Sequence, residues 1–596
     1  MRDTRMKHTR QHSPQRKCPT QGRKTGPGTV LYMLLGALML ATGSCRGPVN
    51  VHEVSGSSPQ AASEEAVAET PGETVALDAG SYLVAHVASY GLDLRKAADN
   101  YALALAKDPS NIALLERSFL MFYINGEIEN AATIAGRIEQ ISEPVELGGE
   151  PAAAIAARNG DWEGLDVLAE HLWADQASRP MGIVLSAWSL AFREQGDAGL
   201  SRLLDLATID HHGAEVTMLV QSALMAEYLG RPGEANAFAG DVLNTASIPP
   251  ASRILMAGIL ARSGKLQDAL DQLDPSLGPF FDKPAIRRDL ENGELLLLPT
   301  PSRRQILANA IIDASQLDDS EQIHLLARLH LASYIDPGYD RLIYMLGREL
   351  FNLGYDDQAQ RQFALMPQNS IWRQPGLILT ARQLSRQKDS TEDAALIYDQ
   401  LIENNPDNPS LLQYAADNDR WAGKFDTALI KYDTALDLAP ASGRLHYYRG
   451  ICLDHLGRED EAEKAFRLAI SFDPEDAYAL NYFGYWLLEQ DKAPAEALGM
   501  IRKAVKKQPR NGYFVDSLGW GLFKLGRYDK AVLYLEQAVT LEPADPVITD
   551  HLGDAYAKLG RMREARYHWQ RALVFANDDT DTEEIRQKIR ATLKEE

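Results

Sequence analysis

Residue types that could carry out catalytic chemistry are scattered in this sequence of 596 residues. It contains no H-E-x-x-H, G-x-S-x-G or G-x-x-x-x-G-K-[ST] motif, which excludes the common zinc-protease, hydrolase and phosphate-loop signatures. His211 and His212 form the best metal-like pair, but adjacent helical residues point about 100° apart and seldom share one metal. Cys452 lies in an apolar stretch, which favours a packed small hydrophobe. The sequence therefore predicts a protein that is not an enzyme and that needs no cofactor and no metal.

A second set of polar and aromatic residues recurs at a fixed spacing and is suited to binding a peptide. Its members form pairs four residues apart: Asn481 with Tyr485, Asp516 with Trp520, and Asp550 with Asp554. Four residues bring a helical side chain back to the same face, so the two members of each pair should project together. Carboxamide and carboxylate oxygens can accept backbone N–H groups, and aromatic rings add rigid contact area. The alternative is structural, with Asp516 and Asp550 favouring a helix N-terminus and Trp520 filling a hairpin interface.

The elements that would position these pairs are helical hairpins, because small residues and prolines recur with a period of about 34 residues. The small residues that begin second helices are Ala394, Ala428, Ala462, Ala497, Ala531 and Ala565. A proline follows twelve residues after the first five: Pro406, Pro440, Pro474, Pro509 and Pro543. First helices carry Gly450, Gly484, Gly519 and Gly553, where two helices would cross closely. From about Leu377 to Leu573 this pattern resembles the tetratricopeptide repeat.

That resemblance implies an all-α superhelical solenoid of about 11–14 helical hairpins with a C-terminal capping helix. The repeat pattern is weaker before Leu273 and is interrupted by several prolines between Leu273 and Asp336. We predict a signal peptide at 1–45, a flexible tether at 46–79, a degenerate N-terminal solenoid at 80–275, an irregular helical junction at 276–336, a regular array at 337–576 and a capping helix at 577–596.

The beginning of the chain has the organisation of an export signal. Basic residues dominate the first 29 positions, and the apolar run 30–41 would reach only about 18 Å as a helix, short of a bilayer core of about 30 Å. The run ends in Gly43, Ser44 and Cys45, which resembles a bacterial lipobox. The resemblance implies that Cys45 is lipidated. An ordinary signal peptide with an incidental cysteine, or an uncleaved anchor, stays open as the alternative.

The charge of the chain limits its partners. The formal net charge is −22, whereas a nucleic-acid-binding surface needs clustered basic residues. We therefore expect protein or peptide partners, no nucleic acid, and contact with a membrane only through the lipid anchor. Homo-oligomerisation stays open.

The C-terminal repeats, 445–576, also resemble a group of bacterial envelope tetratricopeptide proteins, many of them lipoproteins. The stretches that carry this resemblance are 480–485, 515–520 and 550–556. One similar branch contains outer-membrane lipoproteins that bind a periplasmic carboxyl-terminal processing protease and bring substrates to it. The resemblance implies a non-catalytic, lipid-anchored adaptor that recruits a periplasmic enzyme or its substrates. The alternative is a structural component of an outer-membrane assembly or exopolysaccharide secretion machine.

The expected location is the outer membrane, facing the periplasm. By the rules of lipoprotein families, an Asp after the lipidated cysteine favours inner-membrane retention, and this chain has Arg46 there. A soluble periplasmic protein and an inner-membrane anchored protein are the alternatives.

Overall fold

The structure is a computed structural model that describes residues 79–90, 93–173, 175–207, 214–245, 248–273, 277, 280–291, 301–317, 322–577 and 580–593. Every regular element within these ranges is a helix, so the predicted all-α fold is confirmed. The predicted signal peptide, Cys45, almost all of the tether and the pair His211–His212 lie outside the described residues. No described helix combines the length and the apolar composition needed to cross a membrane.

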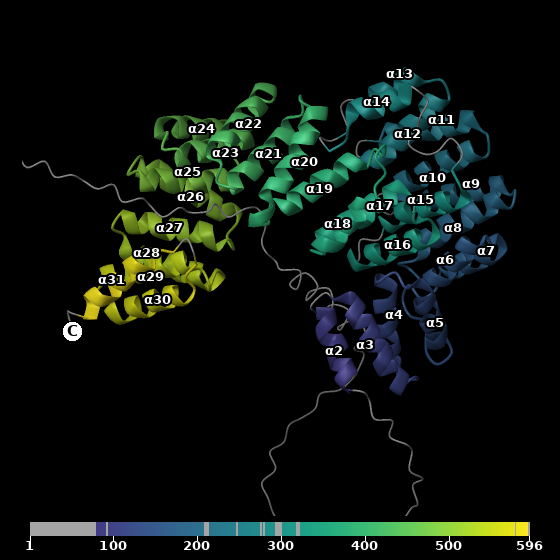
Figure 1. Cartoon of the computed structure of the whole chain (residues 1–596), viewed down its shortest axis with the longest axis horizontal. Coiled ribbons are helices and arrows are strands. Elements are labelled where there is room, and N and C mark those ends of the chain that lie inside the picture. The colour runs from purple at the N-terminus through teal and green to yellow at the C-terminus, as the bar shows by residue number, and fades with distance from the viewer. Residues whose placement is uncertain are drawn as a thin grey trace, which may run out of the picture. The chain divides into compact units, whose positions relative to one another are not determined.

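The described helices form two compact units (Figure 1). The N-terminal unit contains α2 (Ala79–Tyr90), α3 (Leu94–Lys107), α4 (Ile112–Ile124), α5 (Ile128–Glu139), α6 (Glu150–Asn159), α7 (Trp162–His171), α8 (Arg179–Phe192), α9 (Gly196–Ala207), α10 (Ala214–Tyr228), α11 (Pro232–Leu243), α12 (Pro250–Arg262), α13 (Leu266–Leu273), α14 (Lys283–Glu291), α15 (Arg303–Ser315), α16 (Gln322–Ile335), α17 (Asp340–Asn352), α18 (Asp356–Ala364) and α19 (Arg373–Leu384). The C-terminal unit contains η1 (Lys388–Ser390), α20 (Thr391–Asn404), α21 (Pro409–Trp421), α22 (Phe425–Leu438), α23 (Gly443–His455), α24 (Glu459–Phe472), α25 (Ala477–Glu489), α26 (Pro494–Lys507), α27 (Gly512–Lys524), α28 (Tyr528–Leu541), α29 (Pro546–Lys558), α30 (Met562–Val574) and α31 (Thr582–Leu593). This division groups α17–α19 with the N-terminal helices, whereas the repeat spacing grouped 337–386 with the regular array.

Small residues explain the hairpins of the C-terminal unit, in which α21 pairs with α22, α23 with α24, and so on to α29 with α30. All six alanines that the sequence placed at the start of second helices are fully buried. A Cβ on Gly484 would lie only 2.8 Å from the carbonyl oxygen of Ala497, so glycine permits the close crossing of α25 and α26. Gly457 ends its hairpin's first helix at φ +72°, in the left-handed region that favours glycine.

The N-terminal unit departs from a simple stack of hairpins. Its helices α2–α13 pair in chain order, but α15 then packs against α8, and α16 packs against α4 and α6. Since α4, α6 and α8 are the first helices of their hairpins, α15 and α16 cover part of the face that these first helices share. The segment 276–336, predicted as a junction, therefore supplies helices that fill this face.

Buried ion pairs hold these two helices in place. Arg328 of α16 donates from Nη2 to Oε1 of Glu150 at 2.8 Å, and both side chains are almost fully buried, at 1% and 0% exposed. Tyr123 and Ser178 also donate hydrogen bonds to this carboxylate. On α15, Asp313 accepts hydrogen bonds from Gln221 of α10 at 2.6 Å and from Arg341 of α17 at 2.6 Å. The contacts that hold α15 and α16 thus include buried charges that are paired with an opposite charge.

Candidate protein-binding face

The first helices of the C-terminal repeats begin in register. Each has an N-cap whose side chain accepts a backbone N–H of the first turn, and these caps are Asn408, Ser442, Asp476, Asn511 and Asp545. Their spacings of 34, 34, 35 and 34 residues match those of the repeat alanines. Because the caps fix where each helix starts, equivalent residues of α21, α23, α25, α27 and α29 fall on one shared face. We call this surface the C-terminal first-helix face.

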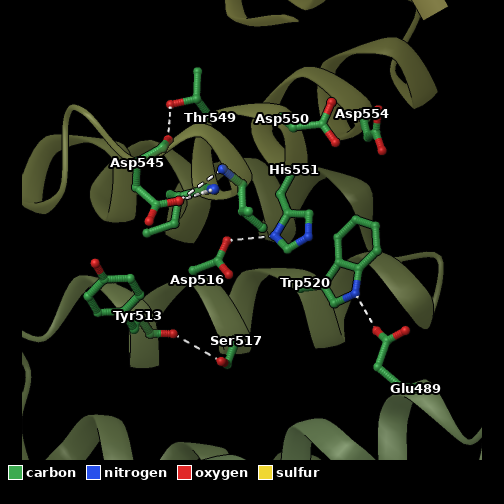
Figure 2. A network of polar contacts seen from close by, with 12 residues as sticks. Glu489, Tyr513, Asp516, Ser517, Trp520, Asp545, Thr549, Asp550, His551 and Asp554 are labelled. Atoms are coloured by element: carbon green, nitrogen blue, oxygen red, sulfur yellow. Dashed lines mark hydrogen bonds and ion pairs between the residues drawn. The ribbon is translucent and has the colours of Figure 1, made fainter. Parts of the chain in front are cut away.

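Asp516 lies on this face but is already engaged. Its side chain is 3% exposed, and its Oδ1 lies 2.8 Å from Nδ1 of His551 in the next repeat (Figure 2). Trp520 stacks on the same imidazole with ring centroids 4.0 Å apart, and its Nε1 donates to Glu489 at 2.8 Å. Trp520 is half-buried and keeps part of its ring at the surface. The pair that the sequence predicted therefore joins neighbouring repeats, and Trp520 alone has surface left for a partner.

Asp550 and Asp554 project from α29 toward the same cation. Nζ of Lys588, on α31, lies 3.1 and 2.9 Å from the two carboxylate oxygens of Asp550 and 2.9 Å from Oδ2 of Asp554. Burial, followed by the neighbouring charge of Asp554, raises the pKa of Asp550 to about 6, while Lys588 opposes the rise. Oδ1 of Asp554 also accepts the indole N–H of Trp569. Both predicted residues are therefore occupied by the C-terminal helix.

Asn481 and Tyr485 of α25 are both half-buried. Oδ1 of Asn481 is shielded from solvent, yet it accepts no hydrogen bond from any residue that the structure describes. A buried amide oxygen without a donor is costly, so a backbone N–H arriving from a ligand would gain the full value of that bond. Among the six predicted residues, Asn481 therefore has the clearest unused hydrogen-bond acceptor.

The structure adds a cluster of aromatic and cationic side chains on α21 and α23 that the sequence interpretation missed. Tyr448 packs under the guanidinium groups of Arg420, at 4.8 Å, and Arg444, at 5.7 Å. Trp421 is 41% exposed beside Arg420. Arg444 is exposed and forms no ion pair with a carboxylate among the described residues, whereas Arg420 is paired with Asp417. Arg444 is therefore a cation available to a partner.

A sequence signal for this cluster was present in the spacing. Tyr414, Tyr448 and Tyr482 are 34 residues apart and occupy equivalent positions on α21, α23 and α25. All three are half-buried. The ring centroid of Tyr447 lies 5.1 Å from that of Tyr448 and 5.7 Å from that of Tyr482, which links these two tyrosines. The result is an aromatic strip along the first-helix face, with Tyr414 at the equivalent position of α21.

The described residues contain neither a cluster of metal ligands nor an exposed thiol. No group of three or more His, Cys, Asp or Glu side chains there is arranged to hold a metal ion. Cys452 is fully buried, and burial raises the pKa of its thiol to about 12, which makes it unsuited to nucleophilic chemistry.

Comparison with known families agrees with this architecture. Residues 415–477, 483–546 and 517–581 match the family model of the tetratricopeptide repeat. The C-terminal unit contains tetratricopeptide repeats. A curated relative, TPR repeat-containing protein PA4667 of Pseudomonas aeruginosa, is 33% identical over 98 residues, which make up 16% of this chain and 17% of the relative's own length.

Several solved structures align with parts of this chain at low sequence identity. MamA of Desulfovibrio magneticus RS-1 aligns over 28% of this chain and 94% of its own, with 20% identity and a TM-score of 0.26. The Cut9–Hcn1 hetero-tetramer of the APC/C aligns over 86% of this chain and 96% of its own, with 14% identity and a TM-score of 0.35. YrrB, described as a TPR protein with an unusual peptide-binding site, aligns over 30% of this chain and 93% of its own, with 20% identity and a TM-score of 0.26.

Proposed function

We propose that this protein is a non-catalytic scaffold that binds a partner protein through the C-terminal first-helix face. Tetratricopeptide repeats form protein-interaction surfaces, so the proposal concerns which surface of this chain the partner contacts. One observation carries the proposal: this face keeps a partly exposed aromatic strip, whereas α15 and α16 fill part of the corresponding face of the N-terminal unit.

The chemistry of the face suits an extended polypeptide. Tyrosine and tryptophan offer large contact areas at small entropic cost, and the strip supplies them in successive repeats. The carboxamide oxygen of Asn481 can accept a backbone N–H, and the exposed guanidinium of Arg444 can take a carboxylate. A partner segment with an acidic or C-terminal carboxylate near one end and an apolar stretch beside it matches this arrangement.

The scaffold would act at the bacterial cell envelope as a lipid-anchored adaptor that recruits a periplasmic enzyme or its substrates. The basic leader, the short apolar run and the lipobox-like end at Cys45 support this part of the proposal, together with the resemblance of 445–576 to envelope lipoproteins. Palmitate labelling that disappears in Cys45→Ala would support the anchor, and labelling that persists would reject it.

A charge reversal tests the binding face. Arg444→Glu should lower the capture of crosslinked envelope proteins by about tenfold or more, because an interfacial charge pair would become a repulsion. Lys464→Glu is the matched control: it makes the same change of charge at an exposed position on the second helix α24, so capture should stay unchanged. Equal capture by both variants, with unaltered helicity, would reject the face.

The captured protein decides the role of the scaffold. A soluble protease or its substrates among the crosslinked products would support the adaptor. A β-barrel protein or a polymer synthase would instead indicate a structural component of an assembly or secretion machine.

A further inference from the structure

The last repeat satisfies its polar residues differently from the repeats before it. Asp516 is paired with His551 of the following repeat, and the indole of Trp520 is satisfied by Glu489 of the preceding one. For Asp550, the residue equivalent to Asp516, the element that follows its hairpin is α31. Its counter-charge comes from Lys588 on α31, which lies outside the repeat pattern.

The contact between α31 and the repeats is shallow. Among the side chains of this twelve-residue helix whose burial the structure describes, the docked face contains Ile585, Lys588, Ile589 and Thr592, and of these Ile585 and Thr592 are buried. The opposite face is exposed. A helix of this length is marginal in water by itself, so its order depends on docking. It is also tied to α30 by the short segment 575–581, which keeps its local concentration high.

The site beneath Lys588 requires a cation. Asp550 and Asp554 stand one helical turn apart on α29, so their charges repel each other unless a positive group lies between them. The nearby charged or titratable groups are His551 on α29 itself and, from α31, Lys588 and Glu584, which is paired with Lys588 at 3.5 Å. Three carboxylate oxygens within 3.1 Å of one ammonium show how well a single Lys side chain meets this requirement.

We propose that α31 is an internal ligand at the end of the C-terminal repeat stack, and that Asp550 and Asp554 form a subsite for a Lys or Arg side chain of a partner helix that displaces it. The partner helix carries the chemistry of the docked face of α31: an aliphatic residue, a cation three positions later and a second aliphatic residue directly after it. The inference goes beyond the proposed function, because α31 packs at the end of the stack, chiefly on α30, and not along the first-helix face.

A peptide added in trans tests the subsite without knowledge of the natural partner. The probe is a fluorescent synthetic peptide of residues 580–596, and the proteins are full-length chains. In Lys588→Glu the tethered helix carries a repulsive charge and should leave the site. We expect the peptide to bind this variant about tenfold or more tightly than the wild type, where the tethered α31 competes. Adding Asp550→Asn and Asp554→Asn to Lys588→Glu should abolish the gain.

Hydrogen exchange on the unmodified chain provides an independent measurement. If α31 undocks by itself, its amide hydrogens should exchange about 100-fold or more faster than those of α29 and α30. Equal exchange rates in the three helices would show that α31 opens only with its repeat and would overturn the proposal. Equal peptide affinities for wild type and Lys588→Glu would overturn it as well. Neither measurement depends on Arg444 or on envelope partners, so failure of the proposed function is detected separately.

Discussion

Replacing Arg328 by methionine should destabilise the N-terminal unit by about 3–5 kcal/mol, because Glu150 would remain as a buried carboxylate without its cation. The loss of stability caused by Arg328→Met should lie near the lower end of this range. Tyr123 and Ser178 would still donate hydrogen bonds to the carboxylate, and Glu150 is the first residue of α6, where the helix dipole favours a negative charge. Glu150→Met should cost more, near the upper end, because the guanidinium would lose the carboxylate that neutralises it at a fully buried position.

The double variant separates the ion pair from simple loss of packing. With both charges replaced by methionine, no buried charge is left unpaired, so the loss should be much smaller than the sum of the two single losses. We expect a coupling free energy of about 3 kcal/mol or more from this cycle. Urea unfolding followed by hydrogen exchange and mass spectrometry would measure it, because peptides from α6 and α16 report on this unit alone.

A surface pair provides the control for this cycle. Arg231 and Asp197 lie 2.7 Å apart in the same unit, but their side chains are 34% and 87% exposed. Replacing both by methionine should leave the unfolding midpoint of the unit unchanged within error, since solvent screens exposed pairs. Additive losses for Arg328 and Glu150, with a coupling near zero, would refute the view that this pair holds α16 against the first helices.

Three further predictions concern the C-terminal unit. Gly484→Ala should destabilise the unit by about 1–3 kcal/mol in thermal unfolding because its Cβ meets a backbone carbonyl, whereas Gly499→Ala, which meets nothing within 4 Å, should stabilise it by about 0.5–1 kcal/mol. The carboxyl group of Asp550 should titrate near pH 6 in ¹³C NMR, because burial raises its pKa above the usual value of about 3.8. Its stabilising contribution should therefore be complete below about pH 4 and be lost as the pH rises through about 6, and this pH dependence of stability should be absent in Asp550→Asn. His551→Leu should cost about 1–3 kcal/mol in the same unfolding assay, because Asp516 would be left buried without a partner.

The hairpins of the C-terminal unit could be predicted from the sequence because the residues that define them act locally. Each repeat alanine is fully buried against its own hairpin, and glycines such as Gly484 permit the crossing of two helices joined by one short turn. Such constraints recur at fixed intervals along the chain, so spacing alone exposes them. The N-cap residues recur with the same period and would have sharpened the prediction of helix starts.

The filling of the N-terminal first-helix face could not be predicted in this way. Arg328 and Glu150 are 178 residues apart, and neither stands in a motif that distinguishes a buried charge from an exposed one. The prolines between Leu273 and Asp336 indicated a break in the repeats, but a break in periodicity does not say where the following helices pack.

The sequence predicted which candidate residues project from the same helix face, but it did not predict which side chains they contact. Asp516 and Trp520 project together from α27, as their spacing indicated (Figure 2). Their actual partner, His551, stands directly after Asp550 in the sequence, so it belongs to a neighbouring position in the next repeat. A residue of one repeat contacts a residue that occupies a different position in the next repeat. A comparison of equivalent repeat positions therefore cannot reveal such contacts.

Additional helices cover repeats of the two units in energetically different ways. In the N-terminal unit the covering helices insert Arg328 and Asp313 into a fully buried network, and removing either charge would strand its partner away from water. In the C-terminal unit the covering helix contributes two isoleucines and one lysine, and Lys588 and both of its aspartates remain 19% exposed. Water can therefore replace Lys588 as it leaves, whereas it cannot replace Arg328. Exchange of an internal helix for an external one is consequently feasible at the last repeat of the C-terminal unit and is strongly opposed in the N-terminal unit.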